Sequence, residues 1–290
     1  MAEPNPAARN PAARNNDAAP SLSIDKGTVL GLLIAVGGIL GGLLLEKGSL
    51  ADIAQGTAAL IVLGGTVGAV LISTPFADVI AAVRELKYVF FEPAASSQAI
   101  LEQLIVFATK ARRNGIVSLE EDVERIEDPF LRKAINLAID VAELTELKHT
   151  MQIDQEMEER RLLSRAKVFE SAGGYSPTIG IIGAVLGLIQ VMKNLANIDE
   201  VGRGIAVAFV ATIYGVGAAN LLFLPAASKI RGRAKRRIET TELILEGVAA
   251  VVEGMNPKMI RRKLESLAGD PEAKPAPVQP TVPVRARAEV

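Results

Sequence analysis

Residues 173–189 read GGYSPTIGIIGAVLGLI, a stretch that has no charged side chain, contains a proline and repeats small residues at helical spacing. It belongs to one of four windows that lack Asp, Glu, Lys and Arg, at 27–45, 53–77, 171–192 and 204–228. About 20 apolar residues cross the hydrocarbon core of a bilayer. One such run is compatible with a buried helix of a soluble protein. Four together predict an all-α integral membrane protein with four transmembrane helices.

The composition excludes several classes of protein. The 290 residues are 49% hydrophobic but only 4% aromatic, with no Cys, no Trp and a single histidine, His149. Disulfides, thiolate metal sites and His-based zinc sites are therefore not expected. A net charge of −1 gives no case for nucleic-acid binding. The GxSxG, GxxxxGK and HExxH motifs are absent, so neither an enzyme nor a cofactor or metal is expected.

The distribution of Lys and Arg predicts the orientation. The short connections at 46–52 and 193–203 hold only Lys47, Lys193 and Arg203 of the 32 basic residues. Basic residues are concentrated in cytoplasmic loops of membrane proteins. Both termini are therefore expected in the cytoplasm, and the large polar segment between the second and third windows is expected there too.

Six segments follow from these patterns. Helical spacing of apolar residues, without strand alternation, runs through the polar segments; Gly115 is expected to end one helix and Ser118 to cap the next. The predicted segments are a disordered tail (1–23), a transmembrane hairpin (24–78), a cytoplasmic helical region (79–170), a second transmembrane hairpin (171–228), cytoplasmic amphipathic helices (229–268) and a second disordered tail (269–290).

None of the four windows contains a carboxylate. The nearest are Asp25, Glu46, Asp52 and Asp78, all at expected membrane interfaces. A charge at the bilayer centre costs about 2.5–3.5 kcal/mol, so intramembrane acids are usually kept for function. If this protein moves ions, the titrating group has to come from another chain. A secondary transporter with its own proton relay is disfavoured.

Small residues form a seam on the third and fourth windows. Gly180, Gly183, Ala184 and Gly187 share one helical face, and Ala208, Thr212, Gly215 and Ala219 are expected to share another. Such seams allow helices to approach closely in lipid. The seam fits packing within one chain, and it also fits self-association or contact with a partner helix.

A proline lies near the cytoplasmic end of each of these windows. Pro177 is expected in a first helical turn, where it costs little. Pro225 lies in a late turn and should leave the carbonyl of Leu221 without its helical donor. The pair is compatible with a mouth or hinge, and equally with prolines tolerated at the ends of spans.

Three stretches carry a resemblance to a known family: AGGYSPTIGIIGAVLGLIQVMKNL at 172–195, GIAVAFVATIYGVGAANLLFLP at 204–225 and ARRNGIVSLEED at 111–122. From about residue 24 to 268 the chain resembles the MotA/PomA stator subunits of the bacterial flagellar motor. The resemblance implies that Pro177 and Pro225 couple ion flow to motion and that Thr212 lies near the ion path. It implies rotor contact by Arg112 and Glu120, with Arg113 and Glu121 as neighbours that could share the role.

The same resemblance implies the partners. A MotB-type protein with one span and a peptidoglycan-binding domain would supply the membrane aspartate, and a switch-complex protein of the rotor would receive the force. Five copies of this chain would form a homo-oligomeric ring around two partner helices in the bacterial inner membrane, with the small-residue seam facing those helices. Sodium-driven relatives tend to place hydroxyls at positions matching Ala184 and Ala211, so protons are favoured as the translocated ion.

Three alternatives remain open at this point. A TolQ/ExbB-type proton-driven energy transducer is the nearest, although it typically has three spans and drives a periplasmic partner. A sodium-driven stator is the second, and a purely structural membrane scaffold the third.

Overall fold

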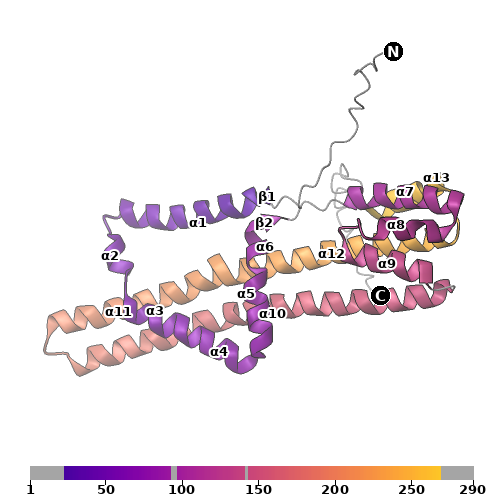
Figure 1. Cartoon of the computed structure of the whole chain (residues 1–290). Coiled ribbons are helices and arrows are strands. Elements are labelled where there is room, and N and C mark those ends of the chain that lie inside the picture. Colours follow the sequence, from indigo (N-terminus) through magenta and orange to yellow (C-terminus); the bar gives the residue numbers. More distant parts are fainter. Residues whose placement is uncertain (1–22, 93–96, 141–142, 269–290) are drawn as a thin grey trace, which may run out of the picture. The chain divides into compact units, whose positions relative to one another are not determined.

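The computed structural model describes residues 23–92, 97–140 and 143–268, most of them in helices (Figure 1). The predicted tails therefore fall outside the described residues, apart from Ser23. Two of the short helical segments, η1 and η3, are π-helical, and η2 is a 3-10 helix. The elements are β1 Ser23–Ile24, α1 Lys26–Leu45, α2 Leu50–Ile53, α3 Gly56–Ala59, η1 Leu60–Gly64, α4 Gly65–Ser73, α5 Phe76–Glu85, α6 Lys87–Phe90, β2 Phe91–Glu92, α7 Ser97–Asn114, η2 Ile116–Leu119, α8 Glu120–Val123, α9 Pro129–Asp140, α10 Leu144–Lys193, α11 Ile198–Gly217, η3 Ala218–Phe223, α12 Leu224–Val252 and α13 Pro257–Ala268.

The chain divides into two compact units. Unit 1 consists of Met1–Ala95 and Glu156–Arg236, and unit 2 consists of Ser96–Gln155 and Arg237–Val290. Helices α10 and α12 each contribute residues to both units.

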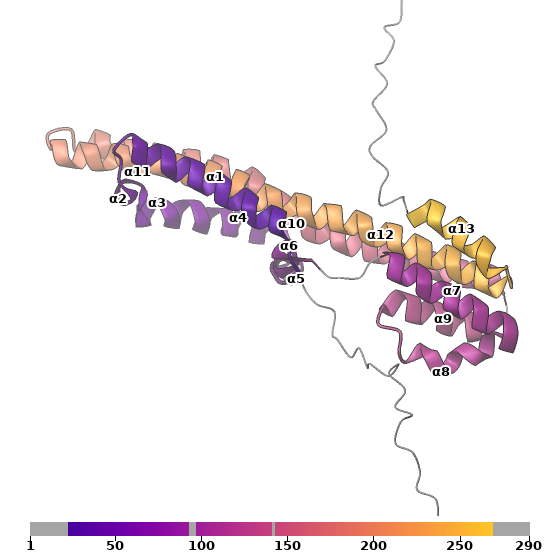
Figure 2. The same cartoon turned by 90° about the horizontal axis from the view of Figure 1, so that it is seen from above.

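Among the described residues, four helical stretches are long and apolar enough to cross a membrane: Lys26–Leu45, Gly56–Ser73, Leu144–Lys193 and Ile198–Val252. Each overlaps one of the four charge-free windows, in the same order. The prediction of a helical protein with four apolar helices is therefore confirmed. Within unit 1, the apolar part of α10 and helix α11 lie side by side in both views (Figures 1 and 2).

A two-residue strand pair departs from the strand-free expectation. Ser23 pairs with Glu92 and Ile24 with Phe91, in antiparallel register. The backbone N–H of Asp25 continues this contact by donating to the carbonyl of Phe90 at 2.9 Å. A strand of two residues is too short to show the alternation of apolar and polar residues by which a strand is recognised in a sequence. The pair ties the start of α1 to the segment after α6.

The third predicted span is the C-terminal part of a much longer helix. Helix α10 has 50 residues and runs without interruption from the polar region into the apolar one. On the other side of the hairpin, α11, η3 and α12 follow one another without a break between Ile198 and Val252.

The described residues of unit 1 form two small apolar clusters. Val70, Ala82, Phe169 and Ile230 belong to the first, which joins α4, α5, α10 and α12. The second joins α3 and η1 to α11 and consists of Ala58, Val62, Val210 and Ala211. Helix α1 buries none of its residues. Most large side chains of the apolar helices are exposed in the single chain, as expected where lipid or another subunit covers them.

Unit 2 has a conventional soluble-type core. Leu101, Leu104, Leu131, Ile135 and Ile244 are fully buried there, so that α7, α9 and α12 pack around one cluster. The amphipathic patterns of these helices explain this arrangement, since each carries apolar residues on one face and charges on the other.

The turn after α7 differs from the predicted cap at Ser118. Helix α7 ends at Asn114, and Gly115 has a φ of +82°, a conformation that favours glycine. The next α-helix does not begin at Ser118, because Ser118 lies inside η2. Its hydroxyl donates to the carbonyl of Gly115 at 2.6 Å and does not accept from a helix N-terminus.

Candidate functional site

The small-residue seam is the contact between α10 and α11 of the same chain. A Cβ on Gly180 would lie 2.9 Å from the carbonyl oxygen of Ala211, and one on Gly187 would lie 2.8 Å from that of Gly204. A Cβ on Gly183 would lie 2.8 Å from the Cβ of Ala211. Two of the three approaches are to backbone atoms, which cannot rotate away. The helices are therefore held at a separation that only glycine permits at these positions.

Three other residues of the seam are buried as well. Ala208 is 6% exposed, Ala219 is 1% exposed and Gly215 is buried. Of the alternatives left open by the sequence, packing within one chain is the contact present in this structure. A partner-facing role of the seam stays a prediction, and in the single chain the glycines are already covered.

Thr212 does not share the buried face of α11. It is exposed, and its hydroxyl donates to the carbonyl of Ala208 at 3.2 Å. Ala211 takes the buried position and is 0% exposed. The expected face through Ala208, Thr212, Gly215 and Ala219 is therefore wrong at Thr212, because the helical contact steps by three residues from Ala208 to Ala211 and then by four residues to Gly215.

Thr212 lies instead on an exposed stripe. Helical spacing places Ile205, Phe209, Thr212, Val216 and Asn220 on one face, and all five are exposed. We refer to these five residues as the exposed stripe. Phe209 is 70% exposed, which makes this face an apolar surface in need of a cover. Its polar groups are the Thr212 hydroxyl and the Asn220 amide, which donates to the carbonyl of Val216 at 2.9 Å.

The predicted ion-path alanines lie in different surroundings. Ala184 on α10 is half-buried. Ala211 is enclosed between α10 and α11, next to Gly183. Of the three positions, Thr212 is the most accessible in the single chain.

Pro177 is not in a first helical turn, contrary to the expectation. It lies well inside α10, which begins at Leu144. An interior proline removes the hydrogen bond to the residue four positions earlier, here Gly173, and its ring crowds that carbonyl. Position 173 is also tightly packed, since a Cβ there would lie 2.6 Å from Cδ2 of Leu224. The sequence could not reveal this, because the polar part of α10 does not look like a continuation of a span.

Around Pro177 the two helices are in direct contact. A Cβ on Gly215 would lie 2.6 Å from the carbonyl oxygen of Ser176 and 3.3 Å from Cα of Pro177. The buried hydroxyl of Ser176 donates to the carbonyl of Gly215 at 3.0 Å. Sequence reasoning missed Ser176, although a serine directly before a proline in an apolar window was a usable signal.

Pro225 follows a π-helical segment. Segment η3 spans Ala218–Phe223, and Pro225 is the second residue of α12. As expected, a proline at 225 leaves the carbonyl of Leu221 without its α-helical donor. The π-helix was not predicted, and such segments often mark functional sites. Both prolines therefore lie in helix interiors.

Tyr214 links α11 to the start of the second apolar helix. Its hydroxyl donates to the carbonyl of Ile53 at 2.5 Å and accepts from the backbone N–H of Gln55 at 3.3 Å. Sequence reasoning missed this residue too, and an isolated tyrosine among apolar residues was the only available signal.

Ion pairs gather at the basic end of the apolar helices. Arg165 pairs with Glu85 at 2.7 Å, Arg231 with Glu170, and Lys229 with Asp25. The Lys229 ammonium is the main cause of the lowered pKa of Asp25, and the backbone N–H of Thr28 adds to it by donating at 3.1 Å. Asp25 thus caps α1 as a carboxylate.

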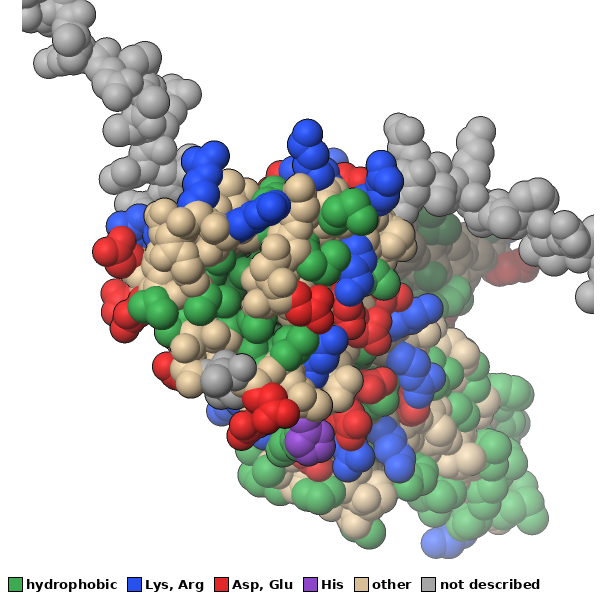
Figure 3. All heavy atoms as spheres, turned by 90° about the vertical axis from the view of Figure 1, so that its right-hand side faces the viewer, with side chains coloured by type: hydrophobic (Ala, Val, Ile, Leu, Met, Phe, Trp, Pro, Cys, Tyr) green, Lys and Arg blue, Asp and Glu red, His purple; other side chains and the backbone are tan. Residues whose placement is uncertain are grey.

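The four predicted rotor-contact residues lie around the turn after α7 in unit 2. Arg112 and Arg113 are in the last turn of α7, and Glu120 and Glu121 begin α8. All four are exposed, and within the described part of the chain none of them forms an ion pair. The turn is braced nearby by Lys110, which pairs with Asp122 at 2.6 Å. Figure 3 shows basic, acidic and hydrophobic side chains interspersed on the face of the molecule that it presents.

These features define a polytopic helical membrane protein with a compact polar unit and charge-free spans. The sequence profile of the MotA/TolQ/ExbB proton channel family matches residues 122–243, and that of the motility protein A N-terminal region matches residues 29–115. Motility protein A of Bacillus subtilis is 34% identical over 245 residues, which cover 83% of this chain and 90% of the relative.

Solved structures agree with the sequence comparison. The C. jejuni MotAB structure superposes with a TM-score of 0.81 at 32% identity, covering 87% of this chain and 98% of the other. The flagellar MotAB stator complex from Bacillus subtilis gives a TM-score of 0.78 at 32% identity, with 83% and 96% covered. The chain therefore belongs to the MotA/TolQ/ExbB proton channel family, among the relatives named motility protein A.

Proposed function

We propose that the chain is the A-type stator subunit of a bacterial flagellar motor, which converts ion flow into torque on the rotor together with a MotB-type partner. The main support is the similarity to MotAB stator complexes over nearly the whole length of both chains. The match of residues 29–115 to the motility protein A N-terminal region favours this role over a TolQ/ExbB-type transducer. The proposed role is conduction and force transmission rather than catalysis of a covalent reaction.

The partner is proposed to supply the titrating acid. No Asp or Glu occurs in the four charge-free windows, so the chain offers no carboxylate of its own at membrane depth. A MotB-type protein with one span, anchored to peptidoglycan, would provide an aspartate. An ionised acid at the centre of a helix costs about 2.5–3.5 kcal/mol in a bilayer, and protonation removes most of this cost.

The exposed stripe is the proposed surface for the partner helix. It carries large apolar side chains with the Thr212 hydroxyl near its middle. A protonated aspartate fits such a surface, and Thr212 offers it a hydrogen-bonding group. Five copies around two partner helices would close a ring in which the stripes face inward. The ring would step as the acid is protonated from outside and deprotonated towards the cytoplasm, near Pro177 and Pro225.

The turn after α7 is the proposed contact with the rotor. Arg112, Arg113, Glu120 and Glu121 present both signs of charge there without being engaged by ion pairs within the described residues. Exposed pairs contribute only about 0–1 kcal/mol each. Contacts of that strength form and break readily, as repeated engagement with a moving rotor requires.

The membrane location follows from the family and the four apolar helices, and the orientation is part of the proposal. With both termini in the cytoplasm, unit 2 faces the rotor and the basic end of the spans lies at the inner leaflet. The translocated ion is proposed to be the proton, since Ala184 and Ala211 lack oxygen ligands for sodium. Steady swimming of the host in sodium-free medium is expected, and loss of rotation there would overturn the proton assignment.

Co-expression with the MotB-type protein of the same genome tests the function. We expect the two chains to purify together and to restore swimming to a host that lacks its own A subunit. The control replaces the partner's membrane aspartate by asparagine and should leave the complex intact but immobile. Proton conduction by this chain alone, reconstituted in vesicles without a partner, would contradict the proposed division of labour.

A further inference from the structure

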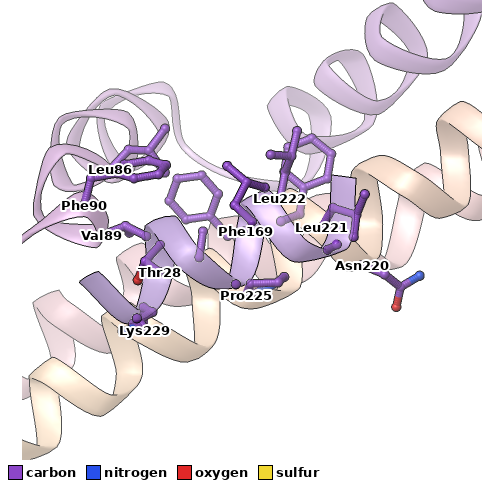
Figure 4. A pocket seen from close by; sticks show the side chains of 16 residues that line it. Thr28, Leu86, Val89, Phe90, Phe169, Asn220, Leu221, Leu222, Pro225 and Lys229 are labelled. Carbon is purple, nitrogen blue, oxygen red and sulfur yellow. The ribbon is translucent and has the colours of Figure 1, made fainter. Parts of the chain in front are cut away.

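A cavity of about 370 Å3 lies within unit 1, between α1, α6, α10 and the segment from η3 into α12 (Figure 4). Its walls are mainly apolar and include Ala35, Val89, Phe169 and Leu222. The volume falls in the range of small-molecule sites, about 300–1,000 Å3. The surface of this chain therefore has a hollow large enough for an apolar ligand, beside the exposed helix α1.

The cavity has a polar group at one end only. In Figure 4, Thr28 and Lys229 lie close together at one end, and Asn220 lies at the opposite end with its amide directed away from the cavity. Lys229 pairs with Asp25 and keeps 38% of its side chain exposed. The Thr28 hydroxyl oxygen is buried without a hydrogen bond of ordinary geometry among the described residues, although it contributes to lowering the pKa of Asp25. A ligand here would be apolar along most of its length and polar beside Lys229.

A basic stretch of α12 begins at that polar end. Residues 229–236 read KIRGRAKR, with five basic residues and no acid. Arg231 pairs with Glu170, and Arg233 donates to the carbonyl of Phe91 at 2.9 Å. Basic clusters directly beside a membrane helix attract anionic lipid headgroups. The apolar cavity suits an alkyl chain, and the basic cluster suits an anionic group. A molecule with an anionic head and an alkyl chain would fit both.

We propose that the cavity binds one acyl chain of an anionic phospholipid, with the lipid phosphate beside Lys229. The lining residues belong to several elements of this chain, and the β1–β2 pair together with the Lys229–Asp25 ion pair holds the start of α1 in place. The bilayer supplies the ligand at the correct depth, because the cavity borders three of the apolar helices. The inference needs a membrane location only and does not depend on the stator function.

Lipid in this position would brace an irregular part of the chain. Leu221 and Pro225 both line the cavity, and the carbonyl of Leu221 is the group that Pro225 leaves without its α-helical donor. An acyl chain packed between α1 and this segment would restrict its bending. Occupancy would then tune the stiffness of the region that follows η3.

Native mass spectrometry of the complex that the full chain forms when it is purified from membranes tests the proposal. The complex is delipidated in mild detergent and then supplied with dioleoylphosphatidylglycerol, dioleoylphosphatidylcholine or oleate. Gly31 lines the cavity and a Cβ there meets nothing within 4 Å, so Gly31→Leu should fill the space without a clash. Gly38→Leu is the matched control, since Gly38 lies two turns further along α1, is equally open and does not line the cavity. Ala35→Leu is a second variant that should fill the cavity, from a different position on α1.

We expect one phosphatidylglycerol per chain in the wild type and in Gly38→Leu, and its loss in Gly31→Leu and Ala35→Leu. Lys229→Gln should reduce the preference for phosphatidylglycerol over phosphatidylcholine about fivefold, the usual weight of one basic residue near a membrane surface. Asp25→Asn should raise that preference, because it releases Lys229 while keeping a residue that caps helices well.

Several results would refute the lipid site. Equal retention in the wild type and both filling variants would show that lipid binds elsewhere. Equal binding of the two phospholipids, or binding of oleate alone, would show that Lys229 selects no phospholipid headgroup. A wild-type complex free of lipid, in which Gly31→Leu but not Gly38→Leu blocks self-association, would assign the cavity to a second copy of this chain.

Discussion

Gly215→Ala should separate α10 from α11 and destabilise the chain. A Cβ at position 215 would lie 2.6 Å from the carbonyl oxygen of Ser176 and 3.0 Å from Cα of Gly180. Both are backbone atoms of the facing helix, so the contact can be relieved only by moving a helix. An ordinary contact begins near 3.4 Å, which requires a shift of about 0.8 Å. A shift of this size also stretches the hydrogen bond from Ser176 to the carbonyl of Gly215.

The expected cost is about 1–3 kcal/mol, typical of overpacking a close contact. Alanine's higher helix propensity offsets up to about 1 kcal/mol of it. Gly217→Ala is the matched control, because Gly217 lies two residues further along and a Cβ there meets nothing within 4 Å. Unfolding of the purified chain by denaturant in mild detergent measures the difference between the two variants. If Gly215→Ala proves as stable as Gly217→Ala, the close approach of the two helices is not what holds this hairpin together.

Three further predictions concern polar side chains. Glu120→Lys should reduce stator recruitment and swimming, because it reverses one charge of the proposed rotor contact. The control Glu127→Lys changes another exposed glutamate and should leave both unchanged. Normal recruitment of Glu120→Lys would show that Glu120 is not part of that contact. Thr212→Ala should reduce the torque measured with tethered cells, because it removes the hydroxyl of the exposed stripe. Ile213→Ala, at the neighbouring position, should reduce the torque less. An equal loss of torque in the two variants would argue against a role of the hydroxyl. Asp25→Asn should lower thermal stability at neutral pH in lipid-free detergent. Because the pKa of Asp25 is lowered in the folded state, its contribution is present above the unfolded pKa of about 3.9 and is lost as the pH falls below that, so the two proteins should converge in strong acid. A difference that persists unchanged in strong acid would show that the ion pair is not its source.

The spans were predictable from sequence because hydropathy is a local property. About twenty apolar residues have few alternatives to a membrane helix, and each charge-free window overlaps a helix that is long and apolar enough to cross a membrane. The seam was also largely predictable, since glycine at helical spacing in an apolar helix has little use except close approach. Which residues face the neighbour is a finer question. The sequence pattern placed Thr212, four residues after Ala208, on the buried face. In the structure, Ala211, three residues after Ala208, takes that position.

The irregular features could not be predicted because they depend on distant parts of the chain. Whether Pro177 begins a helix or interrupts one is decided by the polar residues before it, which are held in α10 by packing against other segments. The π-helical turn at Ala218–Phe223 has no signature in its sequence AANLLF. The contacts of Tyr214 and Ser176 join residues far apart in the chain, so a single sequence gives no indication of their partners.

The two faces of α11 have different surroundings in the single chain, and this difference bears on how force would be produced. The glycine-lined face of α11 is buried against α10, so that the two helices form a closely packed pair. A pair held by backbone contacts transmits displacement without deforming, because neither helix can approach or rotate without a clash. The exposed stripe offers apolar side chains, with the Thr212 hydroxyl near its middle. An ionised acid is costly against such a surface and a protonated one is not. In the proposed mechanism, motion past a partner helix would be permitted only when its acid is neutral, and protonation would therefore release each step.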